Sequence, residues 1–431
     1  MNNLVMPSGR LLLWDAALLG HELQRAMIQL PSVEKVAMAG SLRREKDTVR
    51  NIDLVLQVPR SKRAAAKGEL SQLAQVQHVI SSDEHHLHIL GYAGEVVDVY
   101  MLDAAEYGAG LLYYTGSVAH NLMLENLAAA KGFLLNKHGL FDRKSGQYIA
   151  GKTEEDIYQH LGMQFIPPEL REDNDVIAAA QRFQLPALVS FNKIKGDMHI
   201  HSVWGDGEQK ISALAHYATN AFPHYEYIVV ADHVAGTGCP GGLQPGDFRF
   251  QFKEIDAVNE SMGQHFVKKG VEISLLEDGT PELPDMLLEK FDWVIATVRG
   301  THKDDNTARL LKACDNPHVH CIGRIGPARA EGLNAFSVDW LRLFEQAAIT
   351  GTALEINAYP GQLALSDQLL KTAVEKGVYL VIGTDAHTLA HFDYMQLGVG
   401  KARRAGCSKE HILNTLPWSE MATFKRRKKN A

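Results

Sequence analysis

Two short pairs of metal-binding side-chain types stand at the ends of apolar segments in the second half of the chain. His199 and His201 end one such segment, and Asp385 and His387 end another. Side chains alternate along a strand with a period of two, so the members of each pair project from the same face. Imidazole and carboxylate together are ligands that zinc, manganese or iron accept. The pairs therefore predict two β-strands that deliver a metal centre, and such centres usually perform hydrolysis.

Apolar segments alternate with helix-like amphipathic stretches throughout this half of the chain. The apolar segments are residues 194–202, 227–233, 266–275, 293–298, 318–325, 353–357 and 378–387. Repeated strand–helix alternation predicts parallel strands covered by helices, and seven segments predict an irregular, distorted TIM-like barrel. Polar residues cluster at the end of each segment, where barrels of this class place their active sites; they are His199, His201, Asp232, His233, Glu272, Arg299, Arg324, Glu355, Asn357, Asp385 and His387.

The order of these motifs resembles the polymerase and histidinol phosphatase (PHP) domain, a metal-dependent phosphoesterase barrel. The resemblance extends from about residue 193 to 417 and includes His-x-His, Asp206, the Asp-His ending at His233, the Gly-x-Glu ending at Glu272, and Asp-Ala-His. It implies three metal ions. One ligand set would be His199, His201, Glu272 and Asp385, and another would be Asp206, His233 and His387.

The chain departs from the PHP pattern at two ligands of the third, middle metal. Arg299 and Arg324 stand where the resemblance implies histidines. Arginine stays protonated and cannot bind a cation. Two interpretations remain open: a two-metal site with an arginine clamp for phosphate, or a decayed nuclease whose arginines fill the pocket. His302, just beyond Arg299, is interpreted as a surface-loop histidine because its register does not allow a simple substitution.

Composition excludes several classes of protein. The 431 residues are 45% hydrophobic with a net charge of −7, so any nucleic-acid contact requires a local basic surface. Residues 425–429 are basic and are interpreted as a solubilising tail. No apolar run is long enough for a membrane span, and no secretory signal is recognised. Four cysteines without metal spacing indicate reduced thiols, which predicts a cytoplasmic protein.

The first half of the chain is predicted to be α+β and contains a second motif around Gly40 and Ser41. A Gly-Ser turn between strand and helix exposes backbone N–H groups to a phosphate. With the downstream carboxylates it resembles the nucleotidyltransferase palm of family X DNA polymerases. The resemblance implies that Asp53 and Asp98 bind Mg²⁺ and that Gly40, Ser41 and Arg44 contact a nucleoside triphosphate.

Residues 113–121 resemble the thumb motif of the same family, in a predicted helix over 108–130 that breaks at 115–117. The resemblance implies that Tyr114 packs near the sugar, Gly116 allows close approach, and Asn121 reaches the base edge. Bacterial members join this palm to a PHP exonuclease. We therefore expect a multidomain chain: a palm at 1–103, a thumb at 104–166, a linker at 167–192 and the barrel at 193–431.

Two departures affect the palm. Asn51 replaces the family's first aspartate, and an amide is a weak Mg²⁺ ligand, so two-metal transfer is expected to be impaired unless Glu45 or Asp47 compensates. Only 39 residues precede Gly40, and the helical DNA-gripping region of the family is expected to be missing. The histidines of residues 84–88 are interpreted as an exposed strand rather than a metal site, because no carboxylate lies at ligand spacing.

The first functional hypothesis is thus an enzyme acting on DNA, on single strands or 3′ ends, with Mn²⁺ or Zn²⁺ in the barrel, and with Mg²⁺ and a nucleotide in the palm. Arg299 and Arg324 are expected to stabilise charge during hydrolysis. Two alternatives remain: a template-independent nucleotidyltransferase making short products, and a non-catalytic sensor of nucleotides or DNA ends.

Overall fold

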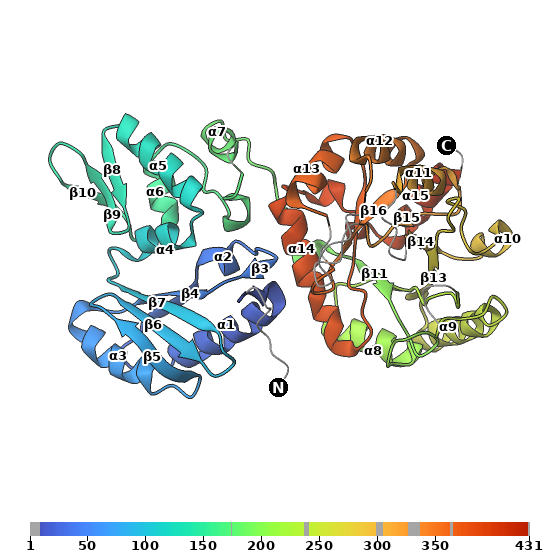
Figure 1. Ribbon diagram of the computed structural model, residues 1–431, viewed down its shortest axis with the longest axis horizontal. Helices are drawn as coiled ribbons and strands as arrows, with labels where there is room; N and C mark the ends of the chain where they lie inside the picture. The colour runs from blue at the N-terminus through green and yellow to red at the C-terminus, as the bar shows by residue number, and fades with distance from the viewer. Residues whose placement is uncertain are drawn as a thin grey trace. The chain divides into compact units, whose positions relative to one another are not determined.

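The computed structural model describes residues 9–173, 175–236, 241–298, 305–325, 337–362 and 365–429. For residues 425–429 it describes the backbone alone. It divides into two compact units, Met1–Leu185 and Pro186–Ala431 (Figure 1). The division falls inside the segment 167–192 that was predicted to be a linker. Within the described residues, no helix has the length and apolar character needed to cross a bilayer.

The first unit contains a five-stranded sheet in the order β2-β4-β7-β6-β5 (Figure 1). Its strands are β2 (Lys35–Met38), β4 (Ile52–Gln57), β5 (Val76–Ser82), β6 (His86–Gly91) and β7 (Val96–Leu102). A separate two-stranded sheet pairs β1 (Leu11–Leu12) with β3 (Thr48–Val49). Helices α1 (Leu13–Met27) and α3 (Arg63–Ser71) pack against the larger sheet. The central strands β4 and β7 are parallel, and this pairing sets Asp53 directly beside Asp98.

The turn that directly follows β2 requires glycine. Helix α2 (Gly40–Arg43) begins at Gly40, whose φ of +58° lies in the left-handed region. A Cβ atom at this position would come within 1.9 Å of Asp53 Oδ2. The missing side chain therefore lets the turn pass directly over one of the predicted palm carboxylates.

The rest of the first unit combines helices with a small sheet, and its first two helices are divided at the predicted break. Helix α4 (Tyr107–Thr115) ends before Gly116, and the Ser117 side chain caps α5 (Val118–Ala130) by accepting from a backbone N–H. A three-stranded sheet of β8 (Phe133–Asn136), β9 (Gly139–Asp142) and β10 (Tyr148–Ala150) precedes α6 (Glu154–His160) and α7 (Val176–Gln181). The sequence did not predict this small sheet.

The second unit is a seven-stranded parallel sheet in simple chain order, as the alternation of segments predicted. Its strands are β11 (Gly196–Ile200), β12 (Tyr227–Val230), β13 (Val267–Ser274), β14 (Trp293–Thr297), β15 (Cys321–Ile322), β16 (Ala353–Asn357) and β17 (Leu380–Gly383). A bridge between Ile200 and Ala386 joins the two edges, so the barrel is nearly closed. The helices of this unit are α8 (Ile211–Ala221), α9 (Phe248–Met262), α10 (Asp285–Leu288), α11 (Thr307–Asp315), α12 (Trp340–Thr350), α13 (Asp367–Glu375), α14 (Met395–Arg404) and α15 (Trp418–Lys429).

Strand alternation decides which side chains enter the barrel. On β13, Val271 and Ile273 belong to the core shared with the helices, so Glu272 between them faces the interior. The same alternation turns Glu355 of β16 inward, because Leu354 and Ile356 pack outward. Lower in the barrel the inward positions are filled by apolar side chains; these are Met198, Tyr227, Val229, Ala231, Trp293, Ile295, Cys321, Ala353 and Val381. Glu272 and Glu355 therefore lie at the carboxyl ends of the strands, next to this buried layer of apolar side chains.

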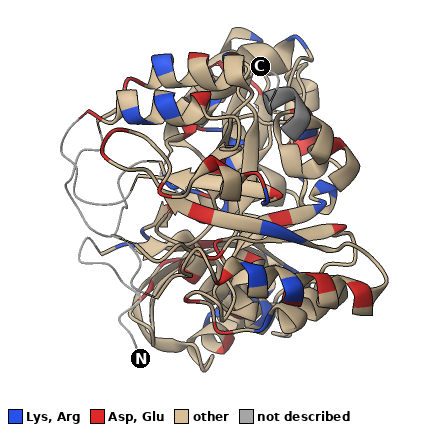
Figure 2. Ribbon diagram, turned by 90° about the vertical axis from the view of Figure 1, so that its right-hand side faces the viewer, with Lys and Arg blue, Asp and Glu red and all other residues tan. Residues whose placement is uncertain are grey.

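Acidic and basic residues are interspersed over the elements of the second unit seen in Figure 2. This distribution agrees with the balanced composition of the chain.

Candidate metal centres

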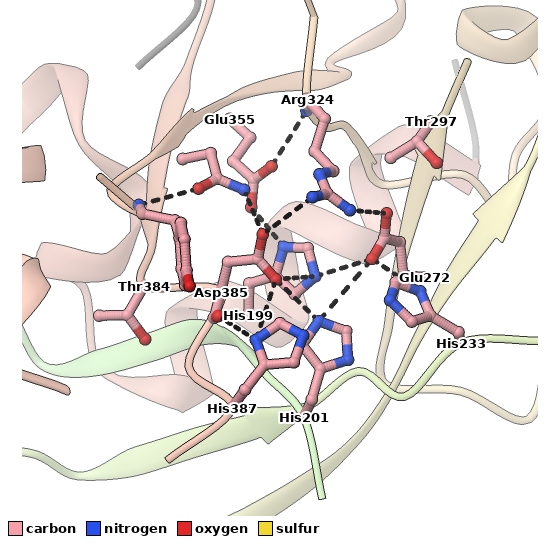
Figure 3. Close-up of polar contacts among 12 residues, drawn as sticks. His199, His201, His233, Glu272, Thr297, Arg324, Glu355, Thr384, Asp385 and His387 are labelled. Atoms are coloured by element: carbon pink, nitrogen blue, oxygen red, sulfur yellow. Dashed lines mark hydrogen bonds and ion pairs between the residues drawn. The ribbon is translucent and has the colours of Figure 1, made fainter. Parts of the chain in front are cut away.

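The first predicted ligand set comes together as one buried cluster at the mouth of the barrel (Figure 3). The donor atoms of His199, His201, Glu272 and Asp385 lie within 4.8 Å of one another. His201 Nε2 lies 2.9 Å from Asp385 Oδ1, and His199 Nε2 lies 3.1 Å from Glu272 Oε2. All four side chains are almost completely buried. Ionisable groups in such a place require partners of opposite charge or a bound cation.

The second predicted set also comes together, and it gains one member. His201, Asp206, His233 and His387 form a cluster in which each residue offers a donor atom within the same 4.8 Å limit. Asp206 Oδ2 lies 3.4 Å from His387 Nε2 and 3.6 Å from His233 Nε2. The side chain of Asp206 is 43% exposed, so this cluster opens toward solvent while the first is closed. His201 belongs to both clusters.

His201 carries the strongest structural indication that cations belong here. Its Nδ1 atom is buried without a hydrogen-bond partner and lies 3.6 Å from Asp206 Oδ1. A buried polar atom with no partner is costly, and a cation between these two atoms would remove the cost. Its Nε2 atom meanwhile faces the first cluster, next to Asp385. The donor set of imidazoles and carboxylates fits divalent transition metals at both positions.

Buried groups behind the ligands hold them in place. Glu355 Oε1 lies 2.6 Å from His199 Nδ1, so the Nε2 atom of His199 is left to face the cluster. The amide of Asn357 donates to Asp385 Oδ2 at 3.0 Å. Carboxylate and amide partners of this kind fix the tautomer and orientation of metal ligands. Both residues lie at strand ends that the sequence had marked as polar, but their supporting role was not predicted.

The charges of the cluster are mutually dependent. Burial by itself raises the pKa of Glu272 and Asp385, but the adjacent histidines outweigh it and hold both pKa values well below the ordinary range. Burial lowers the pKa of His199, but Glu355 and Asp385 outweigh it and raise that pKa well above the ordinary value. The carboxylates are therefore stable here only beside positive charge. Protons on the adjacent histidines provide it at low pH, and a metal ion would provide it by displacing those protons.

Arg324 lies where the sequence placed the missing positive charge. Its guanidinium is 3.7 Å from Glu272 Oε1 and 3.6 Å from Asp385 Oδ2, and its backbone N–H donates to Glu355 Oε2 at 3.1 Å (Figure 3). Its side chain remains 29% exposed. Arg299 and His302, the other residues discussed for this position, lie outside the described residues.

The palm brings together two carboxylates, Asp53 and Asp98, with Asn51 in the place of the family's third. Asp53 and Asp98 are neighbours across β4 and β7, but Asn51 donates its amide to Asp98 Oδ2 at 2.8 Å. Burial and the charge of Asp98 raise the pKa of Asp53 to about 7. Glu45 and Asp47, considered as compensating carboxylates, belong to none of the metal-compatible clusters found among the described residues. These residues do not fit a pair of Mg²⁺ ions held by three carboxylates.

The histidines of residues 86–88 lie in strand β6, as expected, but the expectation that they have no carboxylate partner was wrong. His86 Nε2 and His88 Nδ1 lie 2.8 Å and 2.7 Å from the same oxygen, Oδ1 of Asp98, and the three residues form a metal-compatible cluster. The carboxylate comes from the neighbouring strand, because β6 and β7 pair with His88 opposite Asp98. Spacing along one segment could not show this. The proximity of Asp98 to the histidines depends on the register between β6 and β7, which the short turn between the two strands fixes.

The predicted triphosphate contacts, Gly40, Ser41 and Arg44, lie together at α2 and its end. Arg44 donates its Nε to Glu172 at 2.7 Å and its Nη1 to the Thr115 carbonyl. It therefore joins the palm to the last turn of α4, next to Gly116, within the same unit.

The side chains of two predicted thumb residues contact other elements of the first unit. Tyr114 stacks on Tyr100 with ring centroids 3.6 Å apart. The amide of Asn121 donates to the Tyr113 carbonyl at 2.7 Å.

Comparison with known proteins agrees with both halves. The family model for the DNA polymerase beta thumb matches residues 110–172. The DNA polymerase/3′-5′ exonuclease PolX of Bacillus subtilis (strain 168) is 31% identical over 418 residues, which cover 95% of this chain and 72% of that protein. The chain belongs to this PolX family. It is a DNA polymerase/3′-5′ exonuclease-type enzyme with a PHP-like barrel, as the two motif sets predicted.

Other similarities are partial. A probable phosphatase of Thermoanaerobacter sp. (strain X514) is 26% identical over 237 residues, covering 52% of this PolX chain and 91% of the phosphatase. Human DNA-directed DNA/RNA polymerase mu is 37% identical over 76 residues, or 17% of the chain. A Leishmania infantum polymerase beta structure in a ternary complex has 20% identity and a TM-score of 0.34, over 40% of this chain and 78% of that one.

Proposed function

We propose that this PolX protein removes nucleotides from the 3′ end of single-stranded DNA with two divalent cations in its barrel. The observation that carries the proposal is the pair of clusters that share His201, one closed and one open to solvent through Asp206. Cations would be held by His199, His201, Glu272 and Asp385 in the first, and by His201, Asp206, His233 and His387 in the second. When bound, such ions supply Lewis acidity and a nucleophile at neutral pH.

The protein's own residues position and balance this centre. Glu355 orients His199, and the alternation of β13 aims Glu272 between the two clusters. We propose that Arg324 takes the place of a third cation: it already neutralises Glu272 and Asp385, and its exposed part is available to a phosphate oxygen. A guanidinium can donate two parallel hydrogen bonds to two oxygens of one phosphate, which also stabilises charge that develops during hydrolysis. Arg299, expected to act with it, remains a proposal from the sequence.

The nuclease proposal is tested with single-stranded DNA labelled at either end. With Mn²⁺, a 5′-labelled strand should give a ladder of shortened products, and a 3′-labelled strand should release labelled mononucleotide first. Asp206→Asn should lower the rate at least about 100-fold, because Asp206 is the only described carboxylate of the second cluster. Glu208→Gln, an exposed carboxylate of the same loop, is the matched control and should stay near the unmodified rate. Equal loss in both variants, or degradation from the 5′ end, would contradict the proposal.

We further propose that the palm binds a nucleotide or a DNA end but is impaired in templated synthesis. The support is the Asn51–Asp98 hydrogen bond, which puts an amide donor where the family has a metal-binding carboxylate. Asn51→Asp should raise dNTP incorporation on a primer–template with Mg²⁺ by about tenfold or more. An unmodified protein that extends primers as fast as the variant would refute the impairment.

The same assay separates the alternatives. Products formed without a template would favour a template-independent nucleotidyltransferase. A rise in melting temperature with dNTPs, without any product from either variant, would favour a nucleotide sensor. Both results concern the palm alone, and the nuclease assay tests the barrel proposal separately.

A further inference from the structure

The palm contains a His-His-carboxylate arrangement that the nuclease and nucleotide proposals do not use. His86 and His88 stand two residues apart on β6, so both imidazoles project from the same face of the sheet. Asp98 of β7 lies directly opposite His88 in the strand pairing. One ring nitrogen of each histidine lies within 2.8 Å of Asp98 Oδ1. Three donor atoms from two rigid central strands thus converge on one point.

We propose that this cluster is a binding site for a first-row divalent transition metal, with Zn²⁺ the best match, in the place where a family X palm is expected to hold Mg²⁺. Two imidazoles and one carboxylate are the three-ligand set of many zinc sites that keep one position open. Mg²⁺ prefers oxygen ligands in near-octahedral geometry, and two nitrogen donors disfavour it. In this site Asp98 would therefore bind a transition metal rather than Mg²⁺.

The surroundings of the cluster are organised as those of a metal site are. The Asn51 amide donates to Asp98 Oδ2, which leaves Oδ1 to face the two histidines. The His86 ring stacks on Tyr100 with centroids 4.8 Å apart, which fixes the plane of the imidazole. Tyr100 is in turn stacked on Tyr114. Supporting contacts of this kind orient ligands and raise metal affinity.

This arrangement also gives a reason for asparagine at position 51. An aspartate there would place a second negative charge against Asp98, and it could not donate a hydrogen bond while ionised. The asparagine instead acts as an orienting donor for a carboxylate that already has two histidine partners. The substitution and the histidine pair are thus two parts of one change in the site.

Binding requires only a small local adjustment. Ligand atoms of a tetrahedral zinc site with Zn–N and Zn–O bonds of about 2.0–2.1 Å are separated by roughly 3.3 Å, so the two nitrogens must move from Asp98 by about half an ångström. The side chains of His86 and His88 are 28% and 27% exposed, which leaves room for this shift and for an open coordination position toward solvent. Asp98 is 10% exposed and stays fixed in the sheet.

The test measures bound metal in the full chain. After equilibrium dialysis against Zn²⁺, the double variant His86→Ala/His88→Ala should contain one zinc fewer per chain than the unmodified protein. His78→Ala, an exposed histidine on the adjacent strand β5, is the matched control and should lose none. The barrel clusters are unchanged in all three proteins, so the difference reports the palm alone. Equal zinc content in the double variant and the control would overturn the proposal and leave the histidines as hydrogen-bond partners of Asp98.

A second variant decides the question if the double variant folds poorly. His88→Cys replaces one nitrogen ligand by a thiolate, a ligand that zinc-type sites also accept. With Co²⁺ as the probe, this variant should gain a thiolate-to-cobalt absorption band in the near ultraviolet that the unmodified protein lacks. Cys introduced at His78 should give no such band. Absence of the band in folded His88→Cys protein would refute the site.

Discussion

Replacing Glu355 by glutamine should weaken metal binding in the barrel although Glu355 is not one of the predicted ligands. Both of its carboxylate oxygens accept from donors: Oε1 faces His199 Nδ1 at 2.6 Å, and Oε2 accepts the Arg324 backbone N–H at 3.1 Å. A glutamine has one accepting oxygen and one donating nitrogen. In either orientation its NH₂ group therefore meets a donor, in a position that is almost completely buried.

The magnitude follows from this conflict. A buried donor left without an acceptor costs about 1–3 kcal/mol, and removing a partner behind a metal ligand typically lowers affinity about 10- to 100-fold. Because the contact to His199 is short and shielded from water, we expect a loss of about 100-fold, or roughly 2.7 kcal/mol. The change should be measured by competition for Mn²⁺ or Zn²⁺ with a chromophoric chelator. Exonuclease activity should fall at limiting metal and recover in part when the metal concentration is raised.

Asp197→Asn is the matched control for this experiment. Asp197 is also a buried carboxylate in the barrel, but it accepts from the Thr384 hydroxyl and from backbone N–H groups rather than from a ligand side chain. Its replacement should lower the free energy of unfolding and change metal affinity far less than Glu355→Gln does. If the two variants lose the same affinity, or if Glu355→Gln binds metal normally, the supporting role assigned to Glu355 is wrong.

Three further outcomes are expected. Arg324→Met should slow DNA hydrolysis about 10- to 100-fold with two barrel ions still bound, and an unchanged rate would exclude the phosphate contact. Glu154→Gln should lower the free energy of unfolding, measured by urea titration, by about 3–5 kcal/mol, because it removes the carboxylate that lies 2.8 Å from the buried Arg171 guanidinium. The control Glu155→Gln, at an exposed position, should change the free energy of unfolding little. Burial, with the charges of Arg171 and Arg44, lowers the pKa of His120 to about 3, so between about pH 6.5 and pH 3 the unfolded chain protonates this imidazole and the folded chain does not. The free energy of unfolding should therefore fall by up to about 1.4 kcal/mol per pH unit over this range, and His120→Gln should remove this pH dependence in denaturation curves.

The barrel site was largely predictable because its ligands lie in short motifs at the ends of single strands. Period-two alternation placed His199 and His201 on one face, and the carboxyl ends of parallel strands meet at one end of a barrel. The grouping of the two ligand sets and the position of Arg324 followed from the resemblance to the PHP domain, and the structure brings the same residues together. The sequence did not show that His201 takes part in both clusters, because that depends on which way each ring nitrogen faces.

The features that were missed depend on contacts between distant segments. The carboxylate partner of His86 and His88 lies on another strand, and the register that joins them cannot be read from spacing. Arg171 lies in a charge-rich segment that was predicted to be a linker, yet it is completely buried against Glu154. A buried ion pair and an exposed charged loop have the same composition, so only the folded chain distinguishes them.

We propose that the barrel holds two cations that share His201, with Arg324 in the place of a third. Anomalous X-ray diffraction from crystals soaked in Mn²⁺ measures this directly. We expect two peaks at the barrel mouth, one among His199, His201, Glu272 and Asp385 and one among His201, Asp206, His233 and His387. A third peak beside Arg324, or the absence of a peak between His201 and Asp206, would contradict it.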